Sequence, residues 1–396
     1  MTHQLPPADW TKRECLALLT ATLGADNIRW VGGSVRDTLL GVSVSDVDCA
    51  TVLDPETVMQ RCRDAGIRVV PTGIDHGTVT AVFEAGADSG PVEITTLRKD
   101  VATDGRRATI AYATDWRDDA ARRDFTINAL YAHPKTLAIS DYFGGLADLD
   151  ERRVRFIGDP RERIAEDHLR ILRYYRFQAR FGAALDTAAE AACADMAQTL
   201  KGLSRERICD ELLKLLALPD PHETVARMHT QGVLGVILPE ACAVHVEALA
   251  TLIAAENEQG MEHAPLRRLA ALLPPSRDVA ETCAARLRLS KAQRARLVSA
   301  AERQQSDTDA PEALAYRLGM ESAQDRLLLL GADACALSNF TPPVFPMKGG
   351  EIVARGIAAG PQVARILQGI ESRWIAEGFP NRTRVEEMLT EAVSEN

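Results

Sequence analysis

The chain has 396 residues, of which 46% are hydrophobic and 26% charged, as in ordinary globular proteins, and its length suggests two to four domains. The formal net charge of −10 argues against a protein that coats nucleic acid, although a local basic surface is compatible with it. The eight cysteines form no C-x-x-C pair and no apolar run reaches the roughly 18 residues of a membrane span, so we expect free thiols, no membrane segment and a cytoplasmic protein.

The first 150 residues mix short strand and helix patterns. In several short runs β-branched residues alternate with others, which is typical of strands. The polar run from Lys99 to Asp115 has no clear period and is predicted to be a long flexible loop. The expected strands span residues 28–31, 45–52, 67–70, 77–84 and 91–98, and the expected helices span 9–23, 34–40 and 55–66.

After about residue 150 the strand patterns nearly vanish. Asp159 followed by Pro160 predicts a helix start, with an N-cap and then proline at the first helical position. Helical patterns continue to the end, with interruptions near Pro219, Pro239, Gly260, Pro274–Pro275 and residues 339–350. We therefore predict an α+β head over residues 1–150, a helical neck over 151–215 and a helical body and tail over 216–396.

Two short motifs in the head carry chemistry. In a strand, Asp46 and Asp48 project to the same side, and two carboxylates at this spacing can hold Mg²⁺ together with phosphate oxygens. The preceding "GGSVRD" supplies glycines that let the backbone approach a phosphate, a helix start with free N–H groups, and Arg36. A lone D-x-D is most often a solvated pair, but a phosphate cradle that leads into such a strand is more specific. The dinucleotide and P-loop glycine patterns do not occur.

These motifs stand in a longer ordered series. "GGSVRDTLLG", "SDVDCAT", "TGIDHGTV", "VEITTLR", "RRDFTINAL", "DYFGGLADL" and "RFIGDPRERIAEDHLRILRYYRF" follow one another over roughly residues 28–181. The series resembles the class II tRNA nucleotidyltransferase/poly(A) polymerase family, whose head has the polymerase-β-like nucleotidyltransferase fold with a mixed sheet.

The resemblance implies roles for matching residues in the head. Asp46 and Asp48 would hold Mg²⁺, and Glu93 would supply a third carboxylate near them. The incoming triphosphate would be contacted by Gly33 and Arg36. Nucleotide binding and ribose recognition would fall to Arg123 and Asp124.

In the neck, Asp167, Arg170, Arg173 and Arg176 recur every three residues, which predicts one slowly rotating stripe on a helix. By itself this pattern is typical of a solvated salt-bridge face. The resemblance implies that Asp167 and Arg170, in "EDHLR", bind the base edges of CTP or ATP. Chemically, an aspartate accepts from the exocyclic amino group that C and A both carry. Arg173 and Arg176 are suited to phosphate, base or tRNA backbone.

The activity that the resemblance implies is the template-independent, Mg²⁺-dependent addition of CCA to the 3′ end of tRNA from CTP and ATP, with release of pyrophosphate. The run Lys99–Asp115 favours full CCA addition, because family members that add only CC have lost the corresponding loop. A poly(A) polymerase or an enzyme that adds only A is an alternative with the same chemistry, and a catalytically silent RNA-binding protein is an alternative of another class. Candidate tRNA contacts on the body are Lys201, Arg205, Arg207 and Lys214. The oligomeric state is left open.

Overall fold

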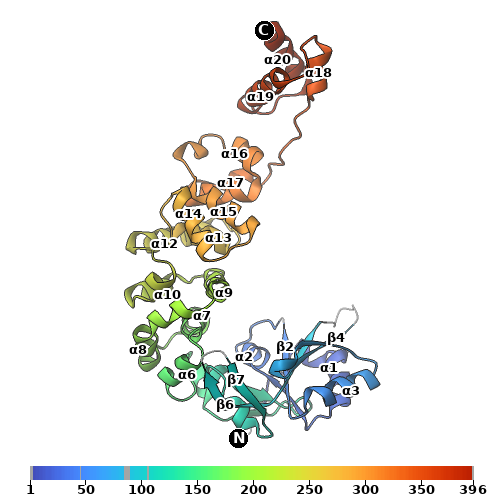
Figure 1. The fold of residues 1–396 in the computed structure, drawn as a ribbon, viewed down its shortest axis with the longest axis vertical. Coiled ribbons are helices and arrows are strands. Elements are labelled where there is room, and N and C mark those ends of the chain that lie inside the picture. Colours follow the sequence, from blue (N-terminus) through green and yellow to red (C-terminus); the bar gives the residue numbers. More distant parts are fainter. Residues whose placement is uncertain (1–2, 45, 84–89, 105–106, 395–396) are drawn as a thin grey trace. The chain divides into compact units, whose positions relative to one another are not determined.

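The computed structural model describes residues 3–44, 46–83, 90–104 and 107–394. The chain divides into two compact units, Met1–Pro239 and Glu240–Asn396 (Figure 1). The predicted division at residue 215 falls in the last turn of the helix Arg205–Leu216, within the first unit, and the three-domain boundaries stay a prediction.

Within the described residues, the first unit contains a mixed sheet of seven strands in the order β3-β4-β5-β2-β1-β8-β9. The pair β2–β5 is parallel, and the other neighbouring pairs are antiparallel. This arrangement sets the two central strands β2 and β5 side by side with the same direction. The strands are β1 Ile28–Val31, β2 Val47–Thr51, β3 Arg68–Gly73, β4 Thr78–Val82, β5 Val92–Thr96, β8 Leu130–Ala132 and β9 Ile139–Asp141.

The prediction of a flexible loop over Lys99–Asp115 was wrong. Strands β6 Arg98–Asp104 and β7 Arg107–Tyr112 pair with each other in an antiparallel two-stranded sheet, apart from the main sheet (Figure 1). A strand in the main sheet alternates because one of its faces is buried against a core. A separate two-stranded sheet does not impose that alternation on the sequence, which is why the period was missing.

Helices pack on the sheet where the sequence predicted them. The expected helix over residues 9–23 consists of a 3-10 turn, Asp9–Lys12, followed by α1 Glu14–Leu23. Helix α3, Pro55–Asp64, contacts α1 and begins where the Asp54 side chain accepts a hydrogen bond from the Thr57 N–H at 2.8 Å. The short helix α2, Gly33–Leu39, connects β1 with the loop before β2.

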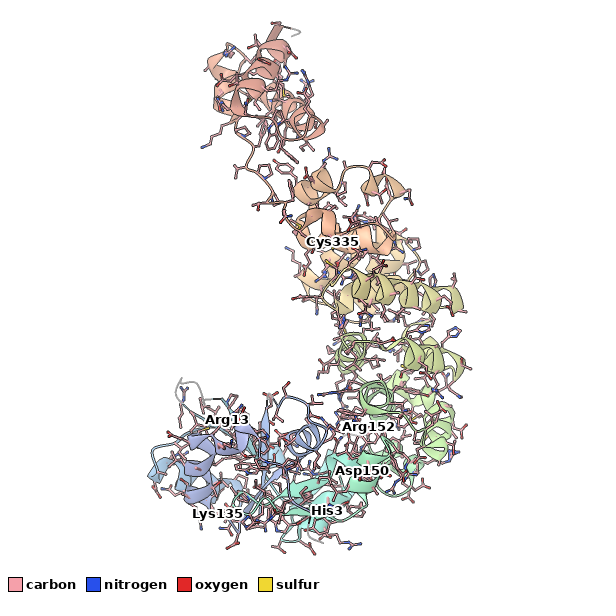
Figure 2. The ribbon with its side chains drawn as sticks, turned by 180° about the vertical axis from the view of Figure 1, so that it is seen from behind. His3, Arg13, Lys135, Asp150, Arg152 and Cys335 are labelled. Atoms are coloured by element: carbon pink, nitrogen blue, oxygen red, sulfur yellow. The ribbon has the colours of Figure 1, made fainter. Side chains whose placement is uncertain are left out.

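Further helices complete the first unit. The carbonyl of Arg152, labelled in Figure 2, accepts a hydrogen bond from the Ala183 N–H at 2.9 Å and so joins the end of the sheet region to the helices. Helices α7 and α9 pack against each other. The helices are α4 Trp116–Ala121, α5 Gly145–Asp150, α6 Pro160–Glu166, α7 Arg170–Phe181, α8 Thr187–Asp195, α9 Arg205–Leu216, α10 His222–Thr230 and α11 Val233–Ile237.

The predicted stripe of charged residues on one helix needs a correction. Helix α6 begins at Pro160 as predicted, but it ends at Glu166, and α7 begins only at Arg170. Between them Asp167 is extended, with φ −149° and ψ 104°, and its side chain accepts a hydrogen bond from the Leu169 N–H at 3.1 Å. A side chain that bonds its own backbone in this way competes with the helix. Asp167 therefore lies at a break and not on the stripe of the three arginines.

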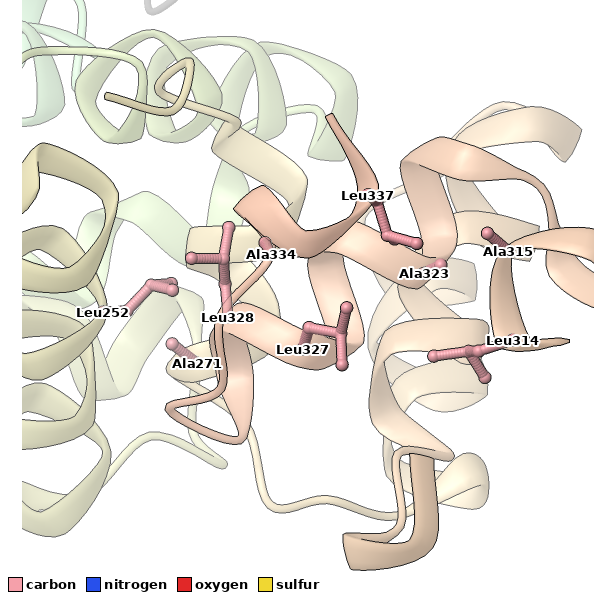
Figure 3. Packing of buried hydrophobic residues seen from close by; sticks show 9 residues of the cluster. All are labelled: Leu252, Ala271, Leu314, Ala315, Ala323, Leu327, Leu328, Ala334 and Leu337. Carbon is pink, nitrogen blue, oxygen red and sulfur yellow. The ribbon is translucent and has the colours of Figure 1, made fainter. Parts of the chain in front are cut away.

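The regular elements of the second unit, among its described residues, are all helices joined by turns and loops. One core cluster joins helices α12, α13, α16 and α17 and includes Leu252, Leu314 and Leu327 (Figure 3). Another surrounds the buried Trp374 in the last three helices. Within the part of the chain that the structure describes, no helix is both long and apolar enough to cross a membrane. The helices are α12 Ala243–Glu258, α13 Pro265–Ala271, α14 Arg277–Arg286, α15 Lys291–Ala301, α16 Pro311–Leu318, α17 Met320–Leu329, α18 Gly349–Ala354, α19 Pro361–Ala376 and α20 Arg382–Ser394.

Candidate active site

Three carboxylates meet on the central strands. Asp46 precedes β2 and Asp48 lies in it; both are exposed, whereas Val47 between them is buried, as the alternation predicted. In the parallel pair β2–β5, Asp48 stands beside Glu93, so the two side chains share one face of the sheet. The structure therefore brings Glu93 to the pair that the sequence spacing had predicted.

The electrostatics of this group favour a cation. Lost hydration and the neighbouring carboxylates of Glu93 and Asp46 raise the pKa of Asp48, against the opposite effect of Arg123 and Arg36. Like charges at this spacing are relieved by a bound cation, and acceptor-only oxygens suit Mg²⁺. Among the described residues, no group of three or more His, Cys, Asp or Glu side chains is arranged so that it could hold a metal ion by itself. A site of few carboxylates is what Mg²⁺ uses when phosphate oxygens complete its shell.

The glycine turn before α2 lies beside the nucleotide-binding candidates. Gly32 has φ +70°, a conformation that favours glycine, and a Cβ there would lie in ordinary van der Waals contact, 3.5 Å from Nη1 of Arg123. Gly33 is the first residue of α2. The backbone N–H groups at a helix start have no partners within the helix and can bind an anion.

Arg36 was predicted to contact the triphosphate, but its side chain does not face solvent. Its side chain is buried, donates to Asp37 Oδ1 at 2.8 Å and to Asn128 Oδ1 at 2.5 Å, and lies over the rings of Phe177 and Phe181. Burial lowers its pKa, although Asp37 opposes this effect. Arg36 thus joins α2 to α7, and its contact with a triphosphate stays a prediction.

Arg123 is held by two residues that the sequence analysis missed. Its Nε donates to the Tyr131 hydroxyl at 3.0 Å, its Nη2 donates to Asp119 Oδ2 at 3.3 Å, and the Tyr131 hydroxyl donates to the same Asp119 oxygen at 2.7 Å. Burial alone would lower the pKa of Arg123, but Tyr131 and Asp119 raise it. The position of Asp119, four residues before Arg123, was the available signal, because i and i+4 share a helix face.

Asp124 is paired with the neck. Its Oδ2 accepts from Arg173 Nε at 2.8 Å and Nη2 at 2.5 Å, and its Oδ1 accepts from the Phe125 N–H at 2.9 Å and Asn128 Nδ2 at 3.0 Å. Burial tends to raise the pKa of Asp124, but Arg173 and these hydrogen bonds lower it to about 2. The structure thus brings together the ribose candidate and one of the predicted neck arginines.

The remaining neck residues are also paired. Asp167 Oδ2 accepts from Arg207 Nη2 at 2.8 Å, and Arg176 Nε donates to the buried Glu211 at 2.7 Å. Both partners lie on α9. The sequence analysis offered Arg207 only as a tRNA contact and missed Glu211, although their i, i+4 spacing placed the two on one face of a predicted helix.

Arg170 sits on the head. Its Nη1 donates to Glu166 Oε2 at 2.5 Å, and its Nη2 donates to the carbonyl oxygen of Arg122 at 3.2 Å. Together with the Arg173–Asp124 pair, this contact fixes the start of α7 against residues 122–124.

Comparison with known proteins identifies the class. Residues 28–155 match the family described as "Poly A polymerase head domain", and residues 182–244 match "Probable RNA and SrmB- binding site of polymerase A". The chain is 34% identical to the mitochondrial CCA tRNA nucleotidyltransferase 1 of Mus musculus, over 98% of this chain and 92% of that protein. It is therefore a nucleotidyltransferase.

Solved structures agree in fold. The Bacillus stearothermophilus CCA-adding enzyme in complex with CTP superimposes with a TM-score of 0.79 at 23% identity, covering 98% of this chain and 99% of that one. The Thermotoga maritima CCA-adding enzyme complexed with tRNA gives a TM-score of 0.71 at 19% identity, covering 100% and 99%. The chain belongs to the tRNA nucleotidyltransferase/poly(A) polymerase family, and the predicted α+β fold with a helical continuation is confirmed.

Proposed function

We propose that the protein adds C, C and A to the 3′ end of tRNA, using CTP and ATP and releasing pyrophosphate. The observation that carries the proposal is that Arg173 donates two hydrogen bonds to Asp124 Oδ2, at 2.5 and 2.8 Å, which fixes the segment after "EDHLR" on the head next to Arg123. The full-length relative is named a CCA tRNA nucleotidyltransferase, and the solved relatives bind CTP or tRNA.

The transfer asks the protein for positioning and charge. Asp46, Asp48 and Glu93 would hold Mg²⁺, which when bound lowers the pKa of the attacking 3′-hydroxyl and stabilises charge on the leaving oxygens. Phosphoryl transfer needs no nucleophilic side chain. Arg123, oriented by Asp119 and Tyr131, carries a fixed positive charge near Asp48, as its influence on the Asp48 pKa shows.

Selection of the base is assigned to the neck. The carboxylate of Asp167 accepts from the exocyclic amino group of cytosine or adenine, and Arg170 donates to a ring nitrogen or carbonyl. Uracil and guanine present the opposite pattern at the corresponding positions, so the protein can act as its own template.

The test uses purified protein, Mg²⁺ and tRNA that ends before CCA, with labelled CTP, ATP or both. Addition of C, C and A supports the proposal. Long A tails on unrelated RNA would favour the poly(A) polymerase, and A alone on a CC-ended tRNA would favour an A-adding enzyme. Binding of tRNA without any incorporation would identify a silent RNA-binding protein.

Asp48→Asn tests the metal carboxylate in the same assay. We expect incorporation to fall by about a thousandfold or more with tRNA binding retained, because a neutral amide holds a divalent cation poorly. Mg²⁺ should raise the melting temperature of the unmodified protein and not that of the variant. The matched control is Asp64→Asn, an exposed aspartate on α3 that bonds Gln60. Normal incorporation by Asp48→Asn would contradict the assignment.

The proposed compartment is the cytoplasm. It is supported by the cysteines, all eight of which are free thiols. The mouse relative is named as mitochondrial. Fractionation of cells that express the tagged chain from its own gene decides between the two compartments.

A further inference from the structure

We propose that Arg207 is a positioning residue for nucleotide selection, which holds the Asp167 carboxylate in the orientation that reads the base. This inference rests on the proposed function, because it needs Asp167 to contact the base. The sequence had offered Arg207 as a tRNA contact on the surface of the helical body.

The argument starts from the place of Asp167 in the chain. The residue lies in the break between α6 and α7 with an extended backbone, so no helix fixes the direction of its side chain. Two other contacts do so. Oδ1 accepts from the Leu169 N–H at 3.1 Å, and Oδ2 accepts from Arg207 Nη2 at 2.8 Å.

These contacts leave the carboxylate available to a ligand. Each carboxylate oxygen has two acceptor positions, and each of these two contacts uses one of them. About a third of the Asp167 side chain is exposed, at 33%. A base edge can therefore bind to an aspartate whose orientation is already set, which is the preorganised state that a selective site needs.

The place of Arg207 on its own helix argues against a stabilising role. It is the third residue of α9, where the helix dipole disfavours a positive charge. Its side chain is 39% exposed, and ion pairs as exposed as this one contribute little to stability. A contribution to stability therefore does not explain why an arginine occupies position 207, whereas its contact that orients Asp167 does.

The charged residues of α9 are complementary to those of α7 and of the break before it. One turn after Arg207, the buried Glu211 accepts from Arg176 at 2.7 Å and lies 3.7 Å from Arg173 Nη1. On α9, Arg207 thus pairs with Asp167, and Glu211 pairs with the arginines of α7. Arg207 is the more informative residue to change, because Glu211 is buried and its loss would unsettle the fold.

The experiment compares Arg207→Gln with Asp167→Asn in single-nucleotide addition to tRNA that lacks CCA. The measured quantity is the ratio of kcat/KM for CTP over UTP, because UTP lacks the amino group that Asp167 would accept from. We expect Arg207→Gln to lower this ratio about tenfold, the usual effect of losing one charge-assisted hydrogen bond. The loss should appear chiefly in KM for CTP, with tRNA affinity and melting temperature unchanged.

Three further variants sharpen the result. Arg207→Lys should recover only part of the ratio, since a lysine cannot reproduce the planar guanidinium contact. Adding Arg207→Gln to Asp167→Asn should change the ratio no further, because the two residues act as a unit. The control Arg227→Gln removes another partly exposed arginine, which lies on α10 and pairs with Glu190 and Glu223, and should leave the ratio unchanged.

Failure of the inference and failure of the proposed function look different. If Asp167→Asn relaxes the CTP preference and Arg207→Gln does not, the Arg207 inference is overturned alone. Weaker tRNA binding by Arg207→Gln with an unchanged ratio also overturns it and restores the surface tRNA contact. If Asp167→Asn itself leaves the ratio intact, the assignment of base selection to Asp167 falls and takes the inference with it.

Discussion

Asp124, which is buried, and the partly exposed Arg173 form the ion pair that joins the nucleotidyltransferase head to helix α7. With the pKa of Asp124 lowered to about 2, the folded state binds fewer protons than the unfolded chain, in which this carboxyl titrates near 4. The contribution of the pair to stability is therefore fully present above about pH 4 and is lost as the pH falls towards 2, an effect of roughly 2 kcal/mol.

Asp124→Asn tests this pair. Because it leaves Arg173 without its main partner, we expect the free energy of unfolding at pH 7 to drop by about 2–4 kcal/mol. The decline of stability between pH 4 and 2 should become shallower, although Asp119 and Asp148, whose pKa values are also lowered, keep part of it. Urea unfolding at several pH values measures both effects. If the free energy of unfolding depends on pH between 4 and 2 in the same way in the variant, the Asp124–Arg173 pair does not contribute to the acid dependence of stability.

At the scale of residues, the sequence predicted where individual side chains lie better than it predicted which residues they pair with. The alternation around Val47 placed Asp46 and Asp48 on one face, since the period of a strand is local. The partner of Asp124 is 49 positions away and the partner of Arg36 is 92 positions away. No local pattern encodes such pairs. The first pair forms only when α7 packs on the head, and the second joins two distant segments within the head.

At the scale of elements, the turn that carries Asp124 is supported from behind by α5. A Cβ on Gly145 would stand 2.3 Å from the carbonyl oxygen of Thr126, so the two backbones approach more closely than any side chain allows. The fully buried Asp148 accepts from the Thr126 hydroxyl at 2.6 Å and from Arg153 and Arg155, each at 2.9 Å. Helix α5 thus determines where the ribose candidate lies.

Gly145→Ala should therefore disturb the site without touching it. The added methyl group must push the Thr126 turn away, and we expect a loss of about 1–3 kcal/mol in stability, as for other overpacked positions. The kcat/KM values for CTP and ATP should fall together, because Asp124 moves and Asp167 does not. The control is Gly235→Ala on α11, where a Cβ meets nothing within 4 Å, so that stability stays level or rises. Full activity of Gly145→Ala would refute the supporting role of α5.

Helix starts were predictable and one helix break was not. The sequence predicted helix starts at Pro55 and at Asp159–Pro160, and in the structure the aspartate before each proline caps its helix. Asp167 has no proline or glycine beside it, and its neighbours continue a helical spacing. The break depends on the side chain of Asp167 bonding the Leu169 N–H and Arg207, and the second of these contacts is tertiary.

At the scale of the whole molecule, each of the two compact units has its own hydrophobic core. The first unit buries the sheet against its helices, and the second contains the clusters around Leu327 and Trp374. The sequence predicted the change from mixed to helical composition near residue 150. The division of the structure after Pro239 depends on which helices pack together, which composition does not reveal.

Separate fragments test this independence. We expect residues 1–239 and residues 240–396 each to give a cooperative thermal transition and a helical spectrum by circular dichroism, and the intact chain to unfold in two steps. The first fragment should bind CTP in the presence of Mg²⁺ and bind tRNA more weakly than the intact chain. A second fragment that lacks a cooperative transition would show that its cores need the head.

The break at Asp167 has a consequence for engineering. The carboxylates assigned to metal binding lie in or directly before strands of the sheet, whereas Asp167, one of the two residues assigned to reading the base, lies in a three-residue interruption between two helices. An interruption tolerates substitution better than a packed strand, since it sustains no ladder of backbone bonds. The nucleotides added to an RNA end could therefore be changed by redesigning Asp167 and Arg207, while the carboxylates assigned to metal binding stay unchanged.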